Sequence, residues 1–112
     1  MKIVKKRASI TARDITNGSA HKCHECPGAL AINRLLKKDW ICAVYSTGVG
    51  YHKVEENTDS FSDPFPYRVK CYFYENEIPG KLRAFMQVFD NDLPAKPVRF
   101  TIEIPEEILR HP

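Results

Sequence analysis

Residues 98–104 alternate between apolar and polar side chains without a break. The apolar positions are Val98, Phe100, Ile102 and Ile104. A period of two residues is typical of a β-strand that turns one face to the core and the other to water. Antiparallel sheets commonly have one solvated face, so this segment predicts a strand in an antiparallel sheet.

Four further segments have the apolar patterns of strands: 4–10, 40–45, 49–54 and 68–74. Two others have the helical period, in which apolar residues recur every three or four positions. The first is 27–38, with the apolar stripe Ala29, Ile32, Leu35 and Leu36. The second is 80–90, with the stripe Leu82, Phe85, Met86 and Phe89.

Thr11 and Asp14 have the spacing of a capping box, which predicts a short helical turn after the first strand. Asn17 and Gly18 should end this turn, because glycine accepts the left-handed conformation common at helix ends. Pro27, directly after Cys26, opens the main helix, because a proline at the first helical position loses no hydrogen bond.

Few of the predicted strands alternate strictly with helices, so the order of elements favours the α+β class over a doubly wound parallel sheet. We expect one α+β domain over residues 1–112, with a mainly antiparallel sheet of four to five strands packed with two amphipathic helices. The polar, proline-broken segment 55–66 should be a mobile loop. Residues 105–112 should form a short tail, with one helical turn at 106–109.

The 112 residues contain no apolar run near the roughly 20 residues that cross a bilayer, and the first ten lack the apolar region of a secretory signal. We therefore expect a protein of the cytoplasm. Charge is uneven along the chain, whose net charge is +3. Residues 1–38 hold nine basic and two acidic side chains, and the remainder holds eight basic and twelve acidic. The first part could therefore bind a phosphate backbone or an acidic protein, unless folding disperses these charges.

Four potential metal ligands lie within six residues: His21, Cys23, His24 and Cys26. A Cys-x-x-Cys pair can hold zinc, although a tetrahedral site normally needs a second pair of ligands, and no second such motif is present. A redox role is another alternative, because the start of a helix could lower the pKa of Cys26. The third and favoured interpretation is that the cysteines are small core residues.

One predicted strand face mixes basic and aromatic side chains: Arg68, Lys70, Tyr72 and Tyr74. Together with Lys5, Lys6, Arg7 and Arg34 it could bind nucleic acid, with cations on phosphates and rings stacked on bases. The alternative to nucleic-acid binding is that these residues form the solvent-exposed face of an antiparallel strand, on which such side chains pair with those of the neighbouring strand.

Phe61 and Phe65 lie in the acidic predicted loop and could anchor in a pocket of a protein partner. Lys37 and Lys38, at the end of the first predicted helix, are further candidate partner contacts. The chain has no phosphate-binding loop, dinucleotide fingerprint or nucleophile elbow. We therefore expect no enzyme activity, no catalytic residues and no cofactor, with zinc as the alternative.

Two stretches together resemble a pattern in small, mostly uncharacterised proteins encoded by bacteriophages, prophages and other mobile elements. The first runs from Ile10 through Asp14, Ile15 and Gly18, and continues with Cys23, Cys26, Pro27 and 29–32. The second joins 85–90 with 96–100 and Ile104–Pro105. The matches cover the two ends of the chain and leave out about 40–80.

The resemblance implies expression in a bacterial cytoplasm from a mobile genome. Small accessory proteins in that setting often bind and block a host protein. We therefore expect a non-enzymatic protein that acts by protein–protein interaction, as an inhibitor of a host defence machine such as a CRISPR effector. The alternative is a small nucleic-acid-binding module that uses the basic N-terminal residues and the 68–74 strand face.

Overall fold

The computed structural model describes residues 2–45, 48–56 and 67–110, and for 54–56 and 67–76 it describes the backbone only. The described elements follow one another as β1 (Ile3–Ile10), α1 (Ala12–Asn17), α2 (Pro27–Asn33), β2 (Trp40–Val44), β3 (Val49–Glu56), β4 (Tyr67–Asn76), α3 (Gly80–Asp90), β5 (Val98–Pro105) and the 3₁₀ turn η1 (Glu106–Ile108). Each strand predicted from the sequence is present, and the helix predicted at 80–90 has these bounds.

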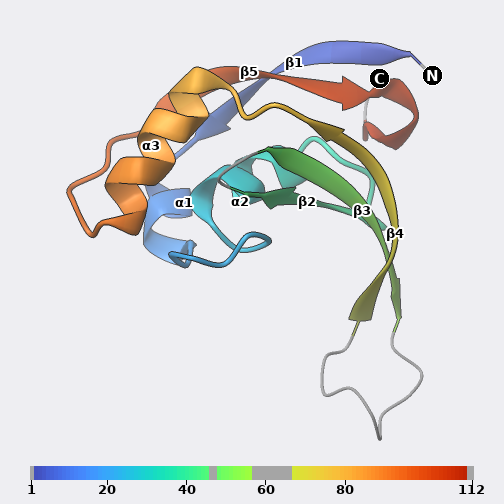
Figure 1. The fold of residues 1–112 in the computed structure, drawn as a ribbon, viewed down its shortest axis with the longest axis horizontal. Coiled ribbons are helices and arrows are strands. Elements are labelled where there is room, and N and C mark those ends of the chain that lie inside the picture. The colour runs from blue at the N-terminus through green and yellow to red at the C-terminus, as the bar shows by residue number, and fades with distance from the viewer. Residues whose placement is uncertain (1, 46–47, 57–66, 111–112) are drawn as a thin grey trace, which may run out of the picture.

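The strands form two antiparallel sheets (Figure 1). In the first, β1 pairs with β5 from Ile3 opposite Pro105 to Ile10 opposite Val98. In the second, β3 lies between β2 and β4. The hydroxyl of Tyr51 in β3 donates a 2.8 Å hydrogen bond to the carbonyl of Glu103 in β5, which joins the sheets. The predicted α+β class is confirmed, with its antiparallel strands divided between a ribbon of two and a sheet of three.

The core lies between the two sheets and the helices. Helix α2 packs on β1 and β2, and α3 packs on β5. Helices α2 and α3 approach closely at Gly28, which has no side chain to prevent it. A Cβ added at Gly28 would lie only 2.6 Å from Cδ1 of Leu82 in α3. The predicted stripe of α3 faces inward, with Leu82, Phe85 and Met86 buried and Phe89 half-buried. Burial of these apolar side chains is the main force that holds such a fold together.

The helix predicted at 27–38 ends at Asn33, so the last five residues of the prediction are wrong. After Asn33 the chain turns and pairs with the C-terminal segment. Leu36 forms a β-bridge with Leu109, and the N–H of Lys37 donates to the carbonyl of Ile108 at 2.8 Å. This pairing satisfies backbone groups that a longer helix would have used, and it removes Lys37 and Lys38 from the helix.

The C-terminal residues are more than a tail, because Ile108 and Leu109 are only 1% exposed. The predicted helical turn is present as η1. Strand β3 continues through Glu55 and Glu56, the first two residues of the predicted loop, and 57–66 lie outside the described residues. Across the described ranges 2–45, 48–56 and 67–110, none of the helices has the length and apolar character needed to cross a membrane.

The predicted capping box is present at the start of α1. The Thr11 side chain accepts from the N–H of Asp14, and the Asp14 carboxylate accepts from the N–H of Thr11 at 2.8 Å. Gly18 follows the helix as predicted, but the left-handed conformation predicted for it is wrong. Its φ of −74° is not left-handed, and glycine is needed there because a Cβ would lie 2.6 Å from Cδ of Pro27.

Candidate binding surface around helix α3

Cys26 caps the N-terminus of α2, as the sequence predicted for a residue before Pro27. Its Sγ accepts a hydrogen bond from the N–H of Ala29 at 3.4 Å, and the residue is 1% exposed. Burial raises the pKa of Cys26 to about 11, because hydrogen bonds from the backbone of Ala29 and Gly28 offset only part of the cost of a buried thiolate. The helix start therefore lowers this pKa, as the redox alternative assumed, but burial outweighs that effect, and the geometry gives no support to a redox role.

The structure does not gather the predicted zinc ligands. Sγ of Cys23 lies 3.5 Å from Nδ1 of His24, whose ring meets the edge of the His52 ring at 5.6 Å between centroids. His21 lines the same hollow as Cys23 and Cys26, and its backbone N–H lies 3.4 Å from Oδ1 of Asp90. Within 2–45, 48–56 and 67–110, no three side chains of His, Cys, Asp or Glu could hold a metal. The zinc alternative therefore has no ligand set in the described part of the chain.

The remaining interpretation of the cysteines fits best. Cys26 and Cys42 belong to the apolar core, and Cys42 is fully buried. Burial raises the pKa of the Cys42 thiol well above its usual range. Burial also lowers the pKa of His24, which favours the neutral ring. These groups behave as packing residues beneath the start of α2.

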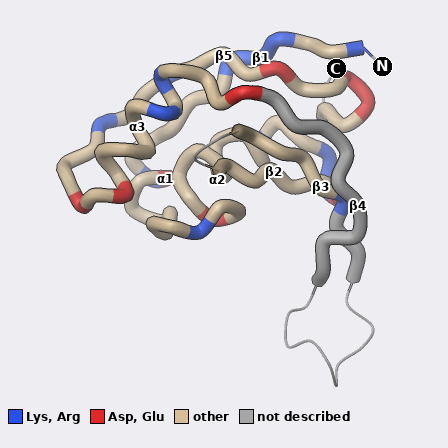
Figure 2. Tube along the Cα trace, in the orientation of Figure 1, with Lys and Arg blue, Asp and Glu red and all other residues tan. Residues whose placement is uncertain are grey.

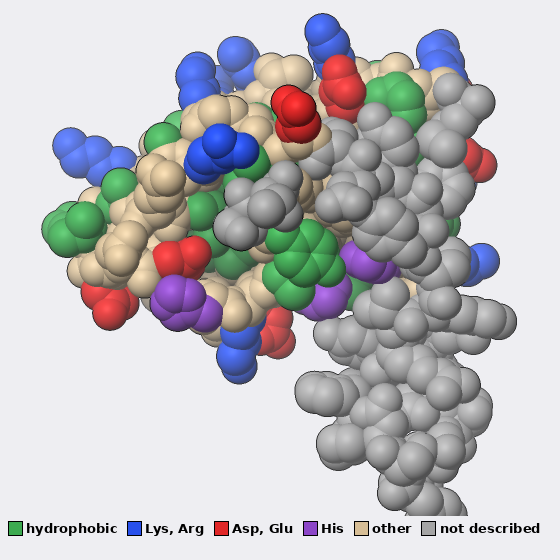
Figure 3. All heavy atoms as spheres, in the orientation of Figure 1, with side chains coloured by type: hydrophobic (Ala, Val, Ile, Leu, Met, Phe, Trp, Pro, Cys, Tyr) green, Lys and Arg blue, Asp and Glu red, His purple; other side chains and the backbone are tan. Residues whose placement is uncertain are grey.

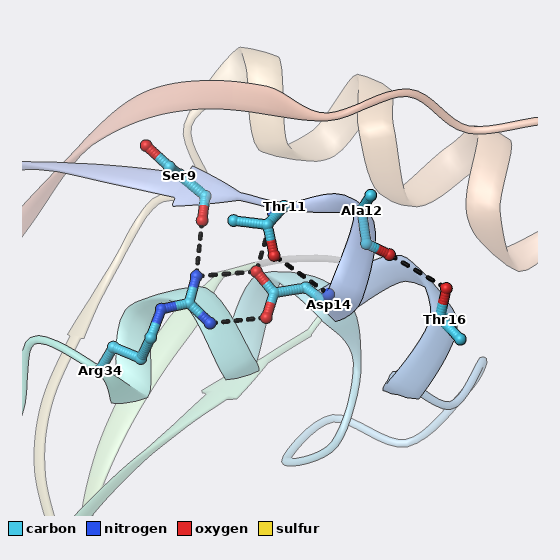
Figure 4. Close-up of polar contacts among 6 residues, drawn as sticks. All are labelled: Ser9, Thr11, Ala12, Asp14, Thr16 and Arg34. Carbon is cyan, nitrogen blue, oxygen red and sulfur yellow. Dashed lines mark hydrogen bonds and ion pairs between the residues drawn. The ribbon is translucent and has the colours of Figure 1, made fainter.

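Arg34, a candidate phosphate contact, binds a carboxylate within the protein (Figure 4). Its guanidinium donates to both oxygens of Asp14, at 2.6 and 2.7 Å, and to the carbonyl of Ser9 at 2.7 Å. The Asp14 side chain is 5% exposed and that of Arg34 is 49% exposed. Arg34 therefore connects α2 to β1 and α1, and its charge is largely neutralised by Asp14.

The basic residues of β1 do not act as one cluster. Lys5 and Arg7 are exposed on one face of the strand, and Lys6 points to the other face and is half-buried. Across the ribbon Lys5 faces Glu103, and Arg99 faces Ser9. Lys5, Arg7 and Arg99 therefore share the outer face of the β1–β5 ribbon, where successive side chains alternate between faces.

Of the other predicted site residues, the structure describes some in full, some by their backbone alone and some not at all. Lys37 and Lys38 are exposed in the segment that follows α2. Arg68, Lys70, Tyr72 and Tyr74 belong to β4, whose backbone pairs with β3, and their side chains lie outside the description. Phe61 and Phe65 lie outside the described residues.

Two grooves flank helix α3, and neither was predicted from the sequence. The first, which we call the His21 groove, has a volume of about 660 Å³. It is lined by His21, Val44, Tyr45, Ile78, Arg83, Met86, Gln87, Asp90 and Asn91. A smaller hollow of about 280 Å³ shares five of these residues and reaches Cys23 and Cys26. The hydrogen bond from the N–H of His21 to Asp90 connects the loop before α2 to the end of α3 along this groove.

The second groove, the Lys96 groove, lies on the β5 side of the helix and has a volume of about 610 Å³. One wall is formed by Lys81, Ala84, Phe85 and Val88 of α3, and the other by 94–99. Figure 3 shows Lys and Arg side chains projecting along the upper and left rim of the molecule, with hydrophobic side chains between them. Lys81 and Ala84 are exposed on α3 and line the Lys96 groove, whereas Gln87 is exposed and lines the His21 groove. The exposed side of the helix therefore lies between the two grooves.

A search of family models, curated proteins and solved structures gives no match to this chain. The class of this protein therefore rests on its own fold and surface. It is a single α+β domain with an exposed helix between two grooves.

Proposed function

We propose that this protein acts by binding another protein, without catalysing a reaction, and that α3 with its two flanking grooves forms the contact surface. The observation that carries the proposal is the exposed helix between grooves of about 660 and 610 Å³. Both volumes lie in the range of ordinary ligand pockets, and both grooves combine apolar walls with a few polar groups. A helix ridge beside apolar hollows supplies the buried contacts that dominate protein–protein affinity.

The chemistry of the reactive residues supports binding over catalysis. Cys26 has a pKa of about 11 and would be almost entirely protonated near neutral pH. Cys42 is fully buried, and the Asp14 carboxylate is held by Arg34 and Thr11. Each of these groups has a structural partner or a closed surrounding, and none is presented to a substrate.

The resemblance to proteins of bacteriophages and mobile elements supplies the setting of the proposal. In that setting the protein works in a bacterial cytoplasm, and its partner is a host protein. A host defence machine such as a CRISPR effector is the class of partner that we propose. Lys37 and Lys38 would add contacts outside the α3 surface.

Affinity capture from nuclease-treated bacterial lysate, read by mass spectrometry, tests the proposal. We expect a stoichiometric protein partner that the double variant Ala84→Gln/Gln87→Arg fails to capture. Both positions are exposed on α3 and accept these residues within a helix. The control is Lys53→Ala, at an exposed position in β3. Recovery of nucleic acid alone, or equal capture by the α3 variant and the wild type, would contradict the proposal.

Nucleic-acid binding is the second candidate function, and one observation favours it. Lys5, Arg7 and Arg99 are exposed on the same outer face of the β1–β5 ribbon, where they could contact successive phosphates. Glu103 lies opposite Lys5 in the same ribbon and reduces the field there. The Arg34–Asp14 pair removes one further cation from the predicted set.

A further inference from the structure

We infer that the Lys96 groove binds a polypeptide segment that carries acidic and apolar side chains. This inference rests on the proposed function, because it names the surface and the chemistry of the partner.

The floor of the groove is apolar. Phe85 is 7% exposed, and Val88, Ala95 and Val98 are half-buried beside it. Ala84 is exposed on the α3 wall and leaves that wall low, because its side chain ends at Cβ. A peptide side chain of the size of leucine or phenylalanine would therefore remove apolar surface from water on both walls.

The charges around this floor have one sign. Lys81, Lys96 and Arg99 line the groove and are exposed, and no carboxylate is among its lining residues. None of the three forms an ion pair with any residue in the described ranges. The His21 groove differs, because Arg83 and Asp90 both line it. Of the two grooves, the Lys96 groove is therefore the one that selects an anionic partner.

The turn that leads into the second wall is tied to the end of α3. The N–H of Leu93 donates to the carbonyl of Val88 at 3.1 Å, and that of Asp92 donates to the carbonyl of Phe89 at 3.1 Å. The side chain of Asn91 donates to the carbonyl of Gln87 at 2.5 Å. These bonds fix the turn before the wall, and the pairing of β5 with β1 fixes Val98 and Arg99 at the other end of the wall, so the groove exists before a partner binds. A preformed groove lowers the entropic cost of binding.

A polypeptide fits this groove better than a nucleic acid does. Single-stranded nucleic acid binds through exposed aromatic rings on which its bases stack, and the aromatic residue of this groove, Phe85, is buried as part of the floor. Leu93, directly before the second wall, is 57% exposed, which makes it the most exposed of the described large hydrophobic residues. An apolar floor with an exposed leucine beside it favours side chains over phosphates and bases. Figure 2 shows Lys and Arg positions on α3 and on the neighbouring strands, and Asp and Glu positions at the turn beyond the helix.

Fluorescence anisotropy with defined probes tests the inference on the full chain at about 150 mM salt. The main probe is a fluorescein-labelled peptide of ten residues that alternates acidic pairs with leucine and phenylalanine. Two probes serve as comparisons: the same peptide with serine in place of leucine and phenylalanine, and a ten-nucleotide thymidine strand. We expect saturable binding of the first probe, at least tenfold weaker binding of the serine peptide, and no saturable binding of the oligonucleotide.

Two variants locate the binding. Lys96→Glu/Arg99→Glu should weaken the main probe at least tenfold, and the matched charge change Lys53→Glu/Arg110→Glu, at exposed positions away from the groove, should change it less than twofold. Ala84→Gln alters the groove wall without changing charge and should weaken binding about fivefold. Circular dichroism spectra equal to the wild type show that each variant is folded.

The inference would be overturned by no saturable binding of the main probe, by equal binding of the serine peptide, or by equal losses in the two charge variants. Tighter binding of the oligonucleotide that is lost in Lys96→Glu/Arg99→Glu and kept in Lys5→Ala/Arg7→Ala would assign the groove to nucleic acid and would also overturn it. The proposed function is judged separately. If lysate capture gives a protein partner that Lys96→Glu/Arg99→Glu still binds fully, the inference fails and the proposed function stands.

Discussion

The guanidinium of Arg34 binds both oxygens of the Asp14 carboxylate, at 2.6 and 2.7 Å, twenty residues apart in the chain. Asp14 also belongs to the capping box of α1, and Arg34 also donates to the carbonyl of Ser9 at the end of β1. One ion pair therefore connects the first strand, the first helix and the end of the second helix. Arg34, which the sequence offered as a phosphate contact, therefore has a structural role.

Arg34→Met should lower the free energy of unfolding by about 2–3 kcal/mol, because it leaves a buried carboxylate without its cation. This figure is at the low end for buried pairs, because 49% of the Arg34 side chain is exposed and water screens part of the interaction. Methionine keeps most of the apolar stem, so the loss reports the guanidinium. The measurement is urea unfolding followed by circular dichroism, and the control is Arg13→Met at an exposed position of α1. Equal stability of the two variants would show that the pair contributes little.

The same pair predicts a pH dependence. Burial alone would raise the pKa of Asp14, but hydrogen bonds from Arg34 and Thr11 and the charge of Arg34 outweigh it and hold the pKa below its usual value. The unfolded chain therefore takes up the proton first as pH falls. The stabilisation is complete above the ordinary aspartate pKa of about 4 and is lost as pH falls further through the folded value. Arg34→Met should reduce this acid loss of stability, and an unchanged profile would contradict the assignment.

Gly18 and Gly80 should respond in opposite directions to alanine. A Cβ at Gly18 would lie 2.6 Å from Cδ of Pro27 and 2.8 Å from the carbonyl oxygen of Asp14, whereas a Cβ at Gly80 would meet nothing within 4 Å. Gly18→Ala should cost about 2 kcal/mol through overpacking. Gly80→Ala, at the first position of α3, should stabilise by up to about 0.5 kcal/mol. Thermal unfolding of both variants measures the contrast, and a Gly18→Ala variant as stable as wild type would contradict the close packing of 18 against 27.

Native thiol labelling should distinguish Cys23 from Cys26. Cys23 is half-buried, whereas Cys26 is 1% exposed and has a pKa of about 11. With that pKa only about one Cys26 thiol in a thousand is ionised at pH 8, and the thiolate is the reactive form. Iodoacetamide at pH 8, followed by peptide mapping, should modify Cys23 at least tenfold faster than Cys26. Faster modification of Cys26 would restore the redox interpretation.

Binding to random duplex DNA should be weak at about 150 mM salt. Lys5, Arg7 and Arg99 are the exposed cations of the β1–β5 outer face, and Glu103 lies among them. Three phosphate contacts would give a slope of about −2.7 in a plot of log affinity against log salt. A titration between low and physiological salt measures both values. Submicromolar binding at 150 mM salt, lost in Lys5→Ala/Arg7→Ala, would promote the nucleic-acid alternative over the proposed function.

Local patterns were sufficient to predict much of this fold. The alternation at 98–104 corresponds to β5, and the stripe from Leu82 to Phe89 corresponds to the buried side of α3. The capping box of Thr11 and the cap at Cys26 were also predicted, because both depend on residues close together in sequence. In both helix caps the hydrogen-bond donor and acceptor lie within a few residues of each other in the sequence.

The errors arose where distant segments compete with local preference. The amphipathic stripe continues to Lys38, yet the chain leaves the helix after Asn33 because Leu36 pairs with Leu109. The redox alternative for Cys26 fails for a similar reason, because burial outweighs the local effect of the helix start on the pKa of the thiol, whereas the favoured prediction of core cysteines agrees with the structure. The Lys96 groove joins α3 to residues on the far side of a turn, and no sequence period marks such a surface.

Photo-cross-linking in bacterial cells tests the central claim most directly. Benzoylphenylalanine would replace Leu93, beside the Lys96 groove, in one variant and Lys53 in the control, both at exposed positions. Illumination, nuclease treatment and mass spectrometry then identify what lies against each position. Binding of a protein on the α3 surface predicts one dominant protein adduct at position 93 and none of that mass at position 53. Adducts of equal yield at both positions, or nucleic-acid adducts alone, would contradict the claim.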